Sequence, residues 1–258
     1  MRYALFFAPS ATSPLWHQGC QWLGRDACTG ETLPQPSFRG IDTEIIVELT
    51  REPARYGFHA TLMAPFRLKD GLDEPTLVKA VEDFASRQYP LSIPPLTVAQ
   101  LDYFFCLRPM RYSAPLQALA AQCTRAFDRF RAPLNPSELA RRKAAPLSGQ
   151  EKKNLELWGY PYVFEQFRFH FTLTMRMAEG KCKDRVHVAL METFEPLLNE
   201  PLLIDALCLF IEPAPGQPLL CVHRFPFSTP SIAFEDRVAH DQQLLPENLY
   251  PGYQCHSA

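Results

Sequence analysis

Two copies of one short motif carry the residues of this sequence that are best suited to chemistry. The segment 58–62, F-H-A-T-L, returns at 169–173 as F-H-F-T-L. A single H-x-T is weak evidence, since about 0.35 matches are expected by chance, but two copies with both flanking residues have a chance expectation of only about 10⁻⁵. The duplication therefore favours a function for both histidines over a place as ordinary core residues.

The residue types in the motif fit the chemistry of phosphate esters. Side chains alternate along a strand, so His59 and Thr61 share one face of the first copy, and His170 and Thr172 share one face of the second. Two such polar stripes are predicted to border a shared cleft. Either imidazole can take or give a proton near neutral pH, and the threonine hydroxyls can donate to phosphate oxygens. The pattern therefore predicts hydrolysis of a cyclic phosphodiester in the shared cleft.

Neighbouring residues supply candidates for substrate binding. Arg55 and Arg168 share the predicted strand parity of the histidines and are candidates to hold a phosphate, with an exposed or salt-bridged arginine as the alternative. Tyr56, Tyr160 and Tyr162 are candidates to stack on a sugar or base, or to bind a phosphate through the hydroxyl. The alternative for these tyrosines is core packing.

Three further basic positions have two interpretations each. Arg25 and Arg131 are candidates to complete an anion pocket, with a structural ion pair as the alternative. The run 141–143, R-R-K, is interpreted as a solvated helix face or as a rim that guides an anionic substrate.

The elements that must position these residues alternate between strands and helices. Apolar periodicity predicts helices at 75–87, 116–130 and 185–198, and short charged helices at 137–143 and 148–158, the second opened by a capping box of Ser148 and Glu151. Strands are predicted at 2–8 and 96–107, with a hairpin of 203–212 and 219–227. The segment 41–49 is interpreted as a strand or a helical turn, and 24–40 as a loop.

Composition limits the class of protein. The chain has 258 residues with 47% hydrophobic and 21% charged residues, which is typical of a globular protein. Its net charge of −2 weighs against a long nucleic acid as partner. No apolar run reaches the roughly 20 residues of a membrane span and no secretory signal is present, so we expect a cytoplasmic protein without a membrane partner. Nothing in the sequence indicates an oligomeric state.

The cysteines do not indicate a metal site. The eight cysteines contain no C-x-x-C, and no histidine–cysteine cluster has zinc-ligand spacing. We therefore expect reduced, mostly buried thiols and no bound metal.

The paired motifs resemble those of the two-histidine phosphoesterase superfamily, which includes RNA 2′,3′-cyclic phosphodiesterases and cyclic-nucleotide hydrolases. Segments 22–26 (W-L-G-R-D), 55–68 (R-Y-G-F-H-A-T-L-M-A-P-F-R-L), 130–134 (F-R-A-P-L) and 158–162 (W-G-Y-P-Y) resemble one branch, encoded beside bacterial phosphonate-utilisation genes. The resemblance covers roughly residues 1–228.

The resemblance implies a fold and an activity. The fold is α+β and bilobal with pseudo-two-fold symmetry, with antiparallel sheets around a central cleft and helices outside. One domain is expected at 1–228, followed by a tail or strap at 229–258. Catalysis would need neither metal nor cofactor, with His59 and His170 as the acid–base pair and Thr61 and Thr172 as phosphate donors. The implied substrate is a small cyclic phosphate ester such as 5-phosphoribosyl 1,2-cyclic phosphate.

Three other functions stay open from the sequence. One is hydrolysis of 2′,3′-cyclic nucleotides or RNA ends, although RNA predicts a more basic surface than this chain has. Another is a binding module for nucleotides or phosphate esters in which turnover has been lost. A structural partner protein is the third, and it would tolerate loss of both histidines.

Overall fold

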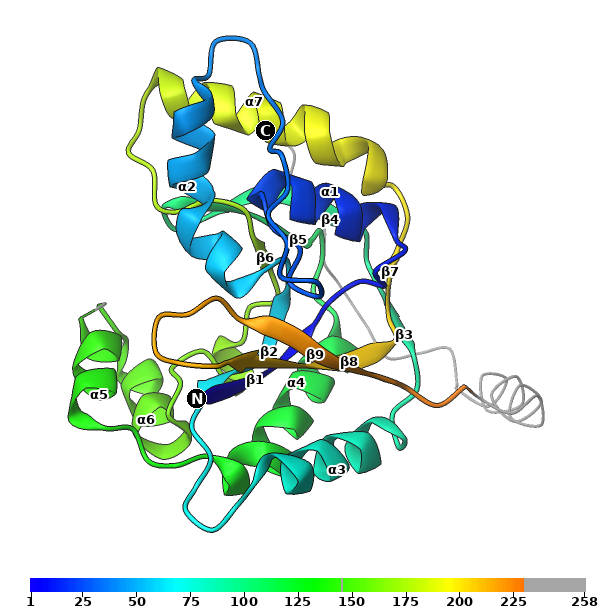
Figure 1. Cartoon of the computed structure of the whole chain (residues 1–258), viewed down its shortest axis with the longest axis vertical. Coiled ribbons are helices and arrows are strands. Elements are labelled where there is room, and N and C mark those ends of the chain that lie inside the picture. The colour runs from blue at the N-terminus through cyan, green and yellow to red at the C-terminus, as the bar shows by residue number, and fades with distance from the viewer. Residues whose placement is uncertain (145, 230–258) are drawn as a thin grey trace, which may run out of the picture.

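The computed structural model describes residues 1–144 and 146–229 (Figure 1). The predicted tail at 229–258 lies outside the described residues, apart from its first residue. The helices of the described part are α1 (Pro14–Leu23), α2 (Thr43–Tyr56), α3 (Glu74–Ala85), α4 (Ala114–Phe127), α5 (Pro136–Lys143), α6 (Gly149–Trp158) and α7 (Lys181–Phe194). Its strands are β1 (Arg2–Phe7), β2 (Ala60–Phe66), β3 (Leu91–Ile93), β4 (Leu96–Leu101), β5 (Phe104–Pro109), β6 (Phe171–Thr172), β7 (Leu202–Ile204), β8 (Ala206–Glu212) and β9 (Leu220–Pro226).

Seven of these strands form one antiparallel sheet in the order β4-β5-β6-β2-β1-β8-β9. Every residue of β1 and β8 is buried, as expected of central strands with continuous apolar runs. Strands β3 and β7 form a separate antiparallel pair. The predicted α+β class is confirmed. Separate sheets on the two sides of a cleft were expected. Instead, β2 pairs with β6, and this pairing joins the two halves into one continuous sheet.

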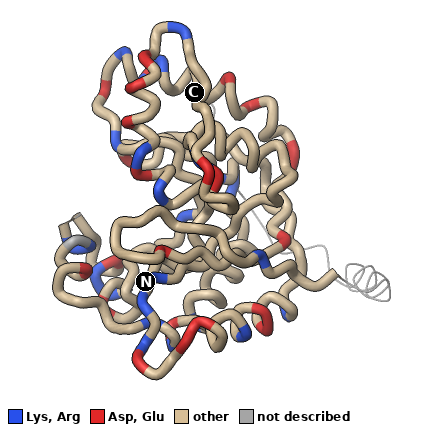
Figure 2. The backbone as a smooth tube through the Cα atoms, viewed as in Figure 1, with Lys and Arg blue, Asp and Glu red and all other residues tan. Residues whose placement is uncertain are grey.

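Helices cover the two halves of the large sheet separately (Figure 1). Helix α1 contacts α2 and α7, and α7 also contacts β4. On the other half, α3 contacts β8 and β9, and α4 contacts β2. Figure 2 shows Lys and Arg interspersed with Asp and Glu on both halves, in keeping with the small net charge.

Most of the predicted helices and strands are confirmed, including the capping box in which Ser148 and Glu151 bond reciprocally. The segment 41–49 is mostly helical, since α2 begins at Thr43. The predicted strand 96–107 is wrong as a single element: it is a hairpin of β4 and β5. Its turn contains Asp102 at a φ of 53°, and neither glycine nor proline marks the position. Asp tolerates this left-handed conformation better than most residues.

The described cysteines are all free thiols. Cys20, Cys106, Cys123 and Cys208 are buried, whereas Cys28 and Cys182 are exposed. Most of the described thiols are therefore buried, as predicted. None of the helices in the described ranges has both the length and the apolar run needed to cross a membrane.

Candidate active site

The pairing of β2 with β6 brings the two motifs side by side. Ala60 lies opposite Phe171 in an antiparallel register. Extending that register by one residue in each direction sets His59 across from Thr172 and Thr61 across from His170. These four side chains therefore share one face, and a local two-fold relation runs through the Ala60–Phe171 pair.

Both imidazoles are held by the same local hydrogen bond. Nδ1 of His59 lies 2.9 Å from the carbonyl oxygen of Gly57, and Nδ1 of His170 lies 2.7 Å from the carbonyl oxygen of Arg168. A carbonyl only accepts, so each Nδ1 must carry the hydrogen. In the neutral form this leaves Nε2 of each ring as the acceptor, and the Thr61 hydroxyl lies 3.3 Å from Nε2 of His59. A neutral imidazole with a free Nε2 is the form that can take a proton from water.

Aromatic packing makes the two histidines unequal. The Phe6 ring stacks on His59 with centroids 3.8 Å apart, and the Tyr56 ring lies at 6.2 Å. Phe104 lies 5.6 Å from His170 in a tilted arrangement. The His59 imidazole is therefore the more tightly enclosed of the two.

Burial lowers the pKa of His59 to about 4, with a smaller lowering from the neighbouring His170 and an opposing effect of the bond to Gly57. Burial also lowers the pKa of His170, where the Arg168 charge acts in the same direction and the bond to the Arg168 carbonyl and the Asp102 charge oppose it. Both imidazoles are thus neutral near pH 7 in the free protein. A negatively charged phosphate beside them would raise the pKa values and allow one ring to become the acid.

We expect His59 to stay neutral, with its hydrogen on Nδ1, as the pH falls from 8 to about 5. The unfolded histidine takes up a proton near pH 6.5 and the folded one only near pH 4. The contribution of His59 to stability is therefore present above pH 6.5 and is lost as the pH falls toward 4. Nitrogen–proton correlation spectra of the imidazoles measure charge and tautomer, with exposed His17 as reference. A His59 midpoint near 6.5 would contradict the expectation.

The motif face borders a cavity of about 450 Å³, a volume suited to a small ligand. Both histidines, both motif threonines and two of the predicted tyrosines line it. Its polar lining includes His59, Thr61, His170, Thr172, Tyr56, Tyr160, Arg142, Thr174 and Arg176.

The other predicted binding residues lie elsewhere. Arg55 lies in the last turn of helix α2 and not in a strand, so its predicted strand parity is wrong. The Arg55 guanidinium is paired with Glu212 at 3.1 Å and Glu52 at 3.3 Å and does not line the cavity. Tyr162 packs edge-on against Tyr160 and does not itself line the cavity. Arg168 is exposed and borders a different cavity that also contains His170.

Several residues that line the cavity of the motif face were not among the predicted site residues. Arg142, from the basic run, lies at the cavity with its guanidinium 5.2 Å from the centre of the Tyr160 ring. Arg176 continues the alternation from His170 and could have been found by that parity. Phe6 and Phe104 come from other strands, and no local pattern in the sequence links them to the motifs.

The segments that flank the motifs hold them in place. The Trp22 indole donates to the Leu173 carbonyl at 2.8 Å, which ties α1 to the second motif. Gly57 has a φ of 79°, and a Cβ there would lie 2.4 Å from that of Ala27, so only glycine allows the turn that aims its carbonyl at His59. Arg25 donates to two backbone carbonyls and Arg131 pairs with Asp128, so both have structural roles and line no part of the cavity of the motif face.

In the described part of the chain, no group of three or more His, Cys, Asp or Glu side chains is placed to hold a metal ion. The groups that line the cavity of the motif face include two neutral imidazoles, hydroxyl groups, the guanidinium groups of Arg2, Arg142 and Arg176, and the Glu52 carboxylate.

Comparison with known proteins gives one family and two curated relatives. The family described as "Protein of unknown function (DUF1045)" matches residues 61–220. The chain is 37% identical over 230 residues to a protein of Janthinobacterium sp. (strain Marseille) named "Ribose 1,5-bisphosphate phosphokinase PhnN", covering 88% of this chain and 51% of the relative. It is 35% identical over 223 residues to a protein of the same name from Laribacter hongkongensis (strain HLHK9), covering 84% of this chain and 49% of the relative. The chain thus spans about half the length of the curated relatives it matches.

Proposed function

The chain belongs to the DUF1045 family, and from that premise we propose that it is a phosphodiesterase of the two-histidine type, which hydrolyses a small cyclic phosphate ester to a monoester. The observation that carries the proposal is the cross-strand arrangement of the two H-x-T motifs, with both Nδ1 atoms donating to backbone carbonyls. Two imidazoles with Nε2 available at one cavity are suited to paired proton transfer.

The proposed reaction uses one imidazole as base and the other as acid. Nε2 of the neutral histidine takes a proton from water as the water oxygen bonds to phosphorus. The bond from phosphorus to one ring-ester oxygen breaks, and the protonated histidine gives its Nε2 proton to that oxygen. The product is a phosphate monoester with a free hydroxyl, and proton exchange with solvent restores both histidines.

The cavity residues supply the electrostatic part of the proposal. The phosphate of the substrate favours protonation of one buried imidazole, whose pKa is low in the free protein. The Thr61 and Thr172 hydroxyls would donate to the non-bridging oxygens as charge develops, with Thr61 exchanging its bond to His59 for one to phosphate. Arg142 and Tyr160 are proposed to contact the rest of the ligand.

The proposed substrate is a ribosyl cyclic phosphate of phosphonate metabolism, as the resemblance implies. The two relatives are named for a kinase that acts on a ribose phosphate, which supports a ribose phosphate as the kind of ligand. This chain, however, contains no G-x-x-x-x-G-K-[ST] sequence, the phosphate-binding loop of one large class of kinases. The kinase activity is therefore not part of the proposal.

Phosphorus NMR of the purified protein tests the proposal. We expect 5-phosphoribosyl 1,2-cyclic phosphate to give a new monoester signal in excess chelator, and a 2′,3′-cyclic nucleotide to react more slowly. Turnover only after a divalent metal is added would contradict the metal-independent mechanism. Binding of either ester without any product, with and without metal, would contradict catalysis and favour a binding module.

A further inference from the structure

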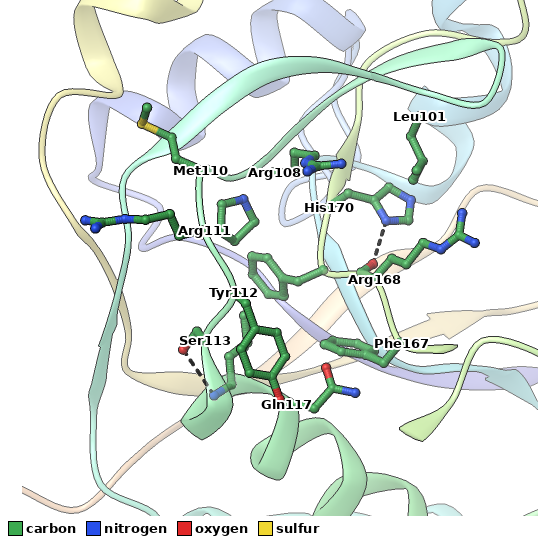
Figure 3. Close-up of a pocket in the computed structure, with 13 residues that line it drawn as sticks. Leu101, Arg108, Met110, Arg111, Tyr112, Ser113, Gln117, Phe167, Arg168 and His170 are labelled. Atoms are coloured by element: carbon green, nitrogen blue, oxygen red, sulfur yellow. Dashed lines mark hydrogen bonds between the residues drawn. The ribbon is translucent and has the colours of Figure 1, made fainter. Parts of the chain in front are cut away.

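A second cavity borders the cavity of the motif face, which is the proposed catalytic cavity, at His170. It has a volume of about 300 Å³ and lies between the end of β5, the first turn of α4 and the strand-like segment before β6 (Figure 3). Three arginines line it and no carboxylate does: Arg108, Arg111 and Arg168. We call these three residues and their cavity the arginine subsite.

The register of β5 with β6 puts Arg108 beside the catalytic histidine. Cys106 pairs with Thr172 and Leu107 with Phe171, so the next position along the register is Arg108 opposite His170. Directly opposed residues of an antiparallel pair project to the same face. Figure 3 shows Arg108 and Arg168 on either side of the His170 imidazole, with Arg111 at the outer edge.

The positive charge of the arginine subsite is only weakly compensated. Arg108 and Arg111 are exposed, and neither forms an ion pair with a carboxylate of the described residues. Arg168 has Asp102 as its partner, at the long distance of 3.9 Å with both side chains about half exposed. By contrast, Arg2 and Arg55 beside the catalytic cavity are paired with the buried Glu212. A concave surface with unpaired guanidinium groups is suited to a phosphate group.

Resting on the proposed function, we propose that the arginine subsite binds a second phosphate group of the same small substrate. The cyclic ester lies at the two imidazoles, and a phosphomonoester on the far end of the molecule reaches past His170 to Arg108. The substrate class is therefore a cyclic phosphate ester that carries a separate phosphomonoester. A cyclic nucleotide without a 5′-phosphate would leave the arginine subsite empty.

Paired substrates test this inference. We measure kcat/KM for ribose 1,2-cyclic phosphate with and without a 5-phosphate, and take the ratio of the two values. The proteins are the wild type, Arg108→Gln, Arg168→Gln and the control Arg87→Gln. Arg87 is an exposed arginine that lines neither cavity. We expect the wild type to prefer the 5-phosphorylated ester by tenfold or more. Arg108→Gln should lower this preference about tenfold, while the control keeps it.

A binding measurement separates failure of the arginine subsite from failure of the proposed function. The affinity for ribose 5-phosphate is measured by calorimetry in the same four proteins. Turnover with no preference for the 5-phosphate, or with a preference that Arg108→Gln leaves intact, overturns the subsite and leaves the hydrolase. Absence of turnover, together with ribose 5-phosphate affinity that falls about tenfold in Arg108→Gln, overturns the hydrolase and supports the subsite. An oligonucleotide with a cyclic end that reacts faster than both ribosyl esters overturns the assignment to a small substrate.

Discussion

Alanine in place of His59 or His170 is expected to lower kcat for the cyclic ester by about 10²–10⁴-fold, the range typical of a lost general acid or base. Each variant leaves one imidazole, which cannot both accept the proton of water and protonate the leaving oxygen. The double variant should be little slower than either single one, because residues that act as a pair are not additive. Initial rates from phosphorus NMR at pH 7 measure all three proteins.

His17→Ala is the matched control for these variants, since His17 is exposed on α1 and lines neither cavity. It should keep the wild-type rate. Circular dichroism must show that the active-site variants are folded, because His59 stacks on Phe6 in the core. If a folded His59→Ala or His170→Ala protein keeps more than about a tenth of the wild-type rate, the paired-histidine mechanism is wrong.

The sequence predicts the centre of the candidate site because its motifs are local and duplicated. Two F-H-x-T-L segments with alternating burial must each place His and Thr on one face of a strand. That the two strands are neighbours follows from the antiparallel register at Ala60 and Phe171, which no single-strand pattern contains. The aromatic partners come from two other pairings, Phe6 from β1 beside β2 and Phe104 from β5 beside β6. No single-strand pattern contains these pairings either, so the two residues were not predicted.

The errors at the edge of the site come from backbone turns. The pattern of 55–62 reads as one strand, but Gly57, with its positive φ, ends α2 and starts a new direction before His59. The residues before that turn, Arg55 among them, follow helical geometry instead of strand parity. The hairpin turn at Asp102 was not predicted for a related reason. A positive φ at a residue other than glycine leaves only a weak signal in the sequence, so 96–107 was predicted as a single strand.

Replacement of Glu212 by glutamine is expected to lower the free energy of unfolding by about 3–5 kcal/mol, as is usual when one partner of a buried ion pair is removed. The Glu212 side chain is fully buried at the end of β8. It accepts hydrogen bonds from Arg2, from Arg55 at 3.1 Å and from the Gly216 amide at 3.0 Å. Without its charge, the Arg2 guanidinium, 11% exposed, loses its carboxylate partner, and Arg55, 18% exposed, keeps only the exposed Glu52. Urea denaturation at pH 7 measures the change.

Glu52→Gln is the matched control, because Glu52 pairs with the same Arg55 but is 54% exposed. Its loss should cost less than about 1 kcal/mol.

Burial alone would raise the pKa of Glu212, but the bonds from Arg2 and Gly216 and the charges of Arg2 and Arg55 outweigh burial and hold this pKa below its usual value. The stabilisation is thus present above about pH 4.5 and is lost as the pH falls through the lowered pKa, so the difference between wild type and Glu212→Gln should shrink in acid. Equal destabilisation by the two variants would show that the buried carboxylate has no special role. Arg55 also donates to the Tyr56 hydroxyl at 2.8 Å, and Tyr56 lies against His59, so the same ion pair connects the stability of β8 to the position of the His59 imidazole.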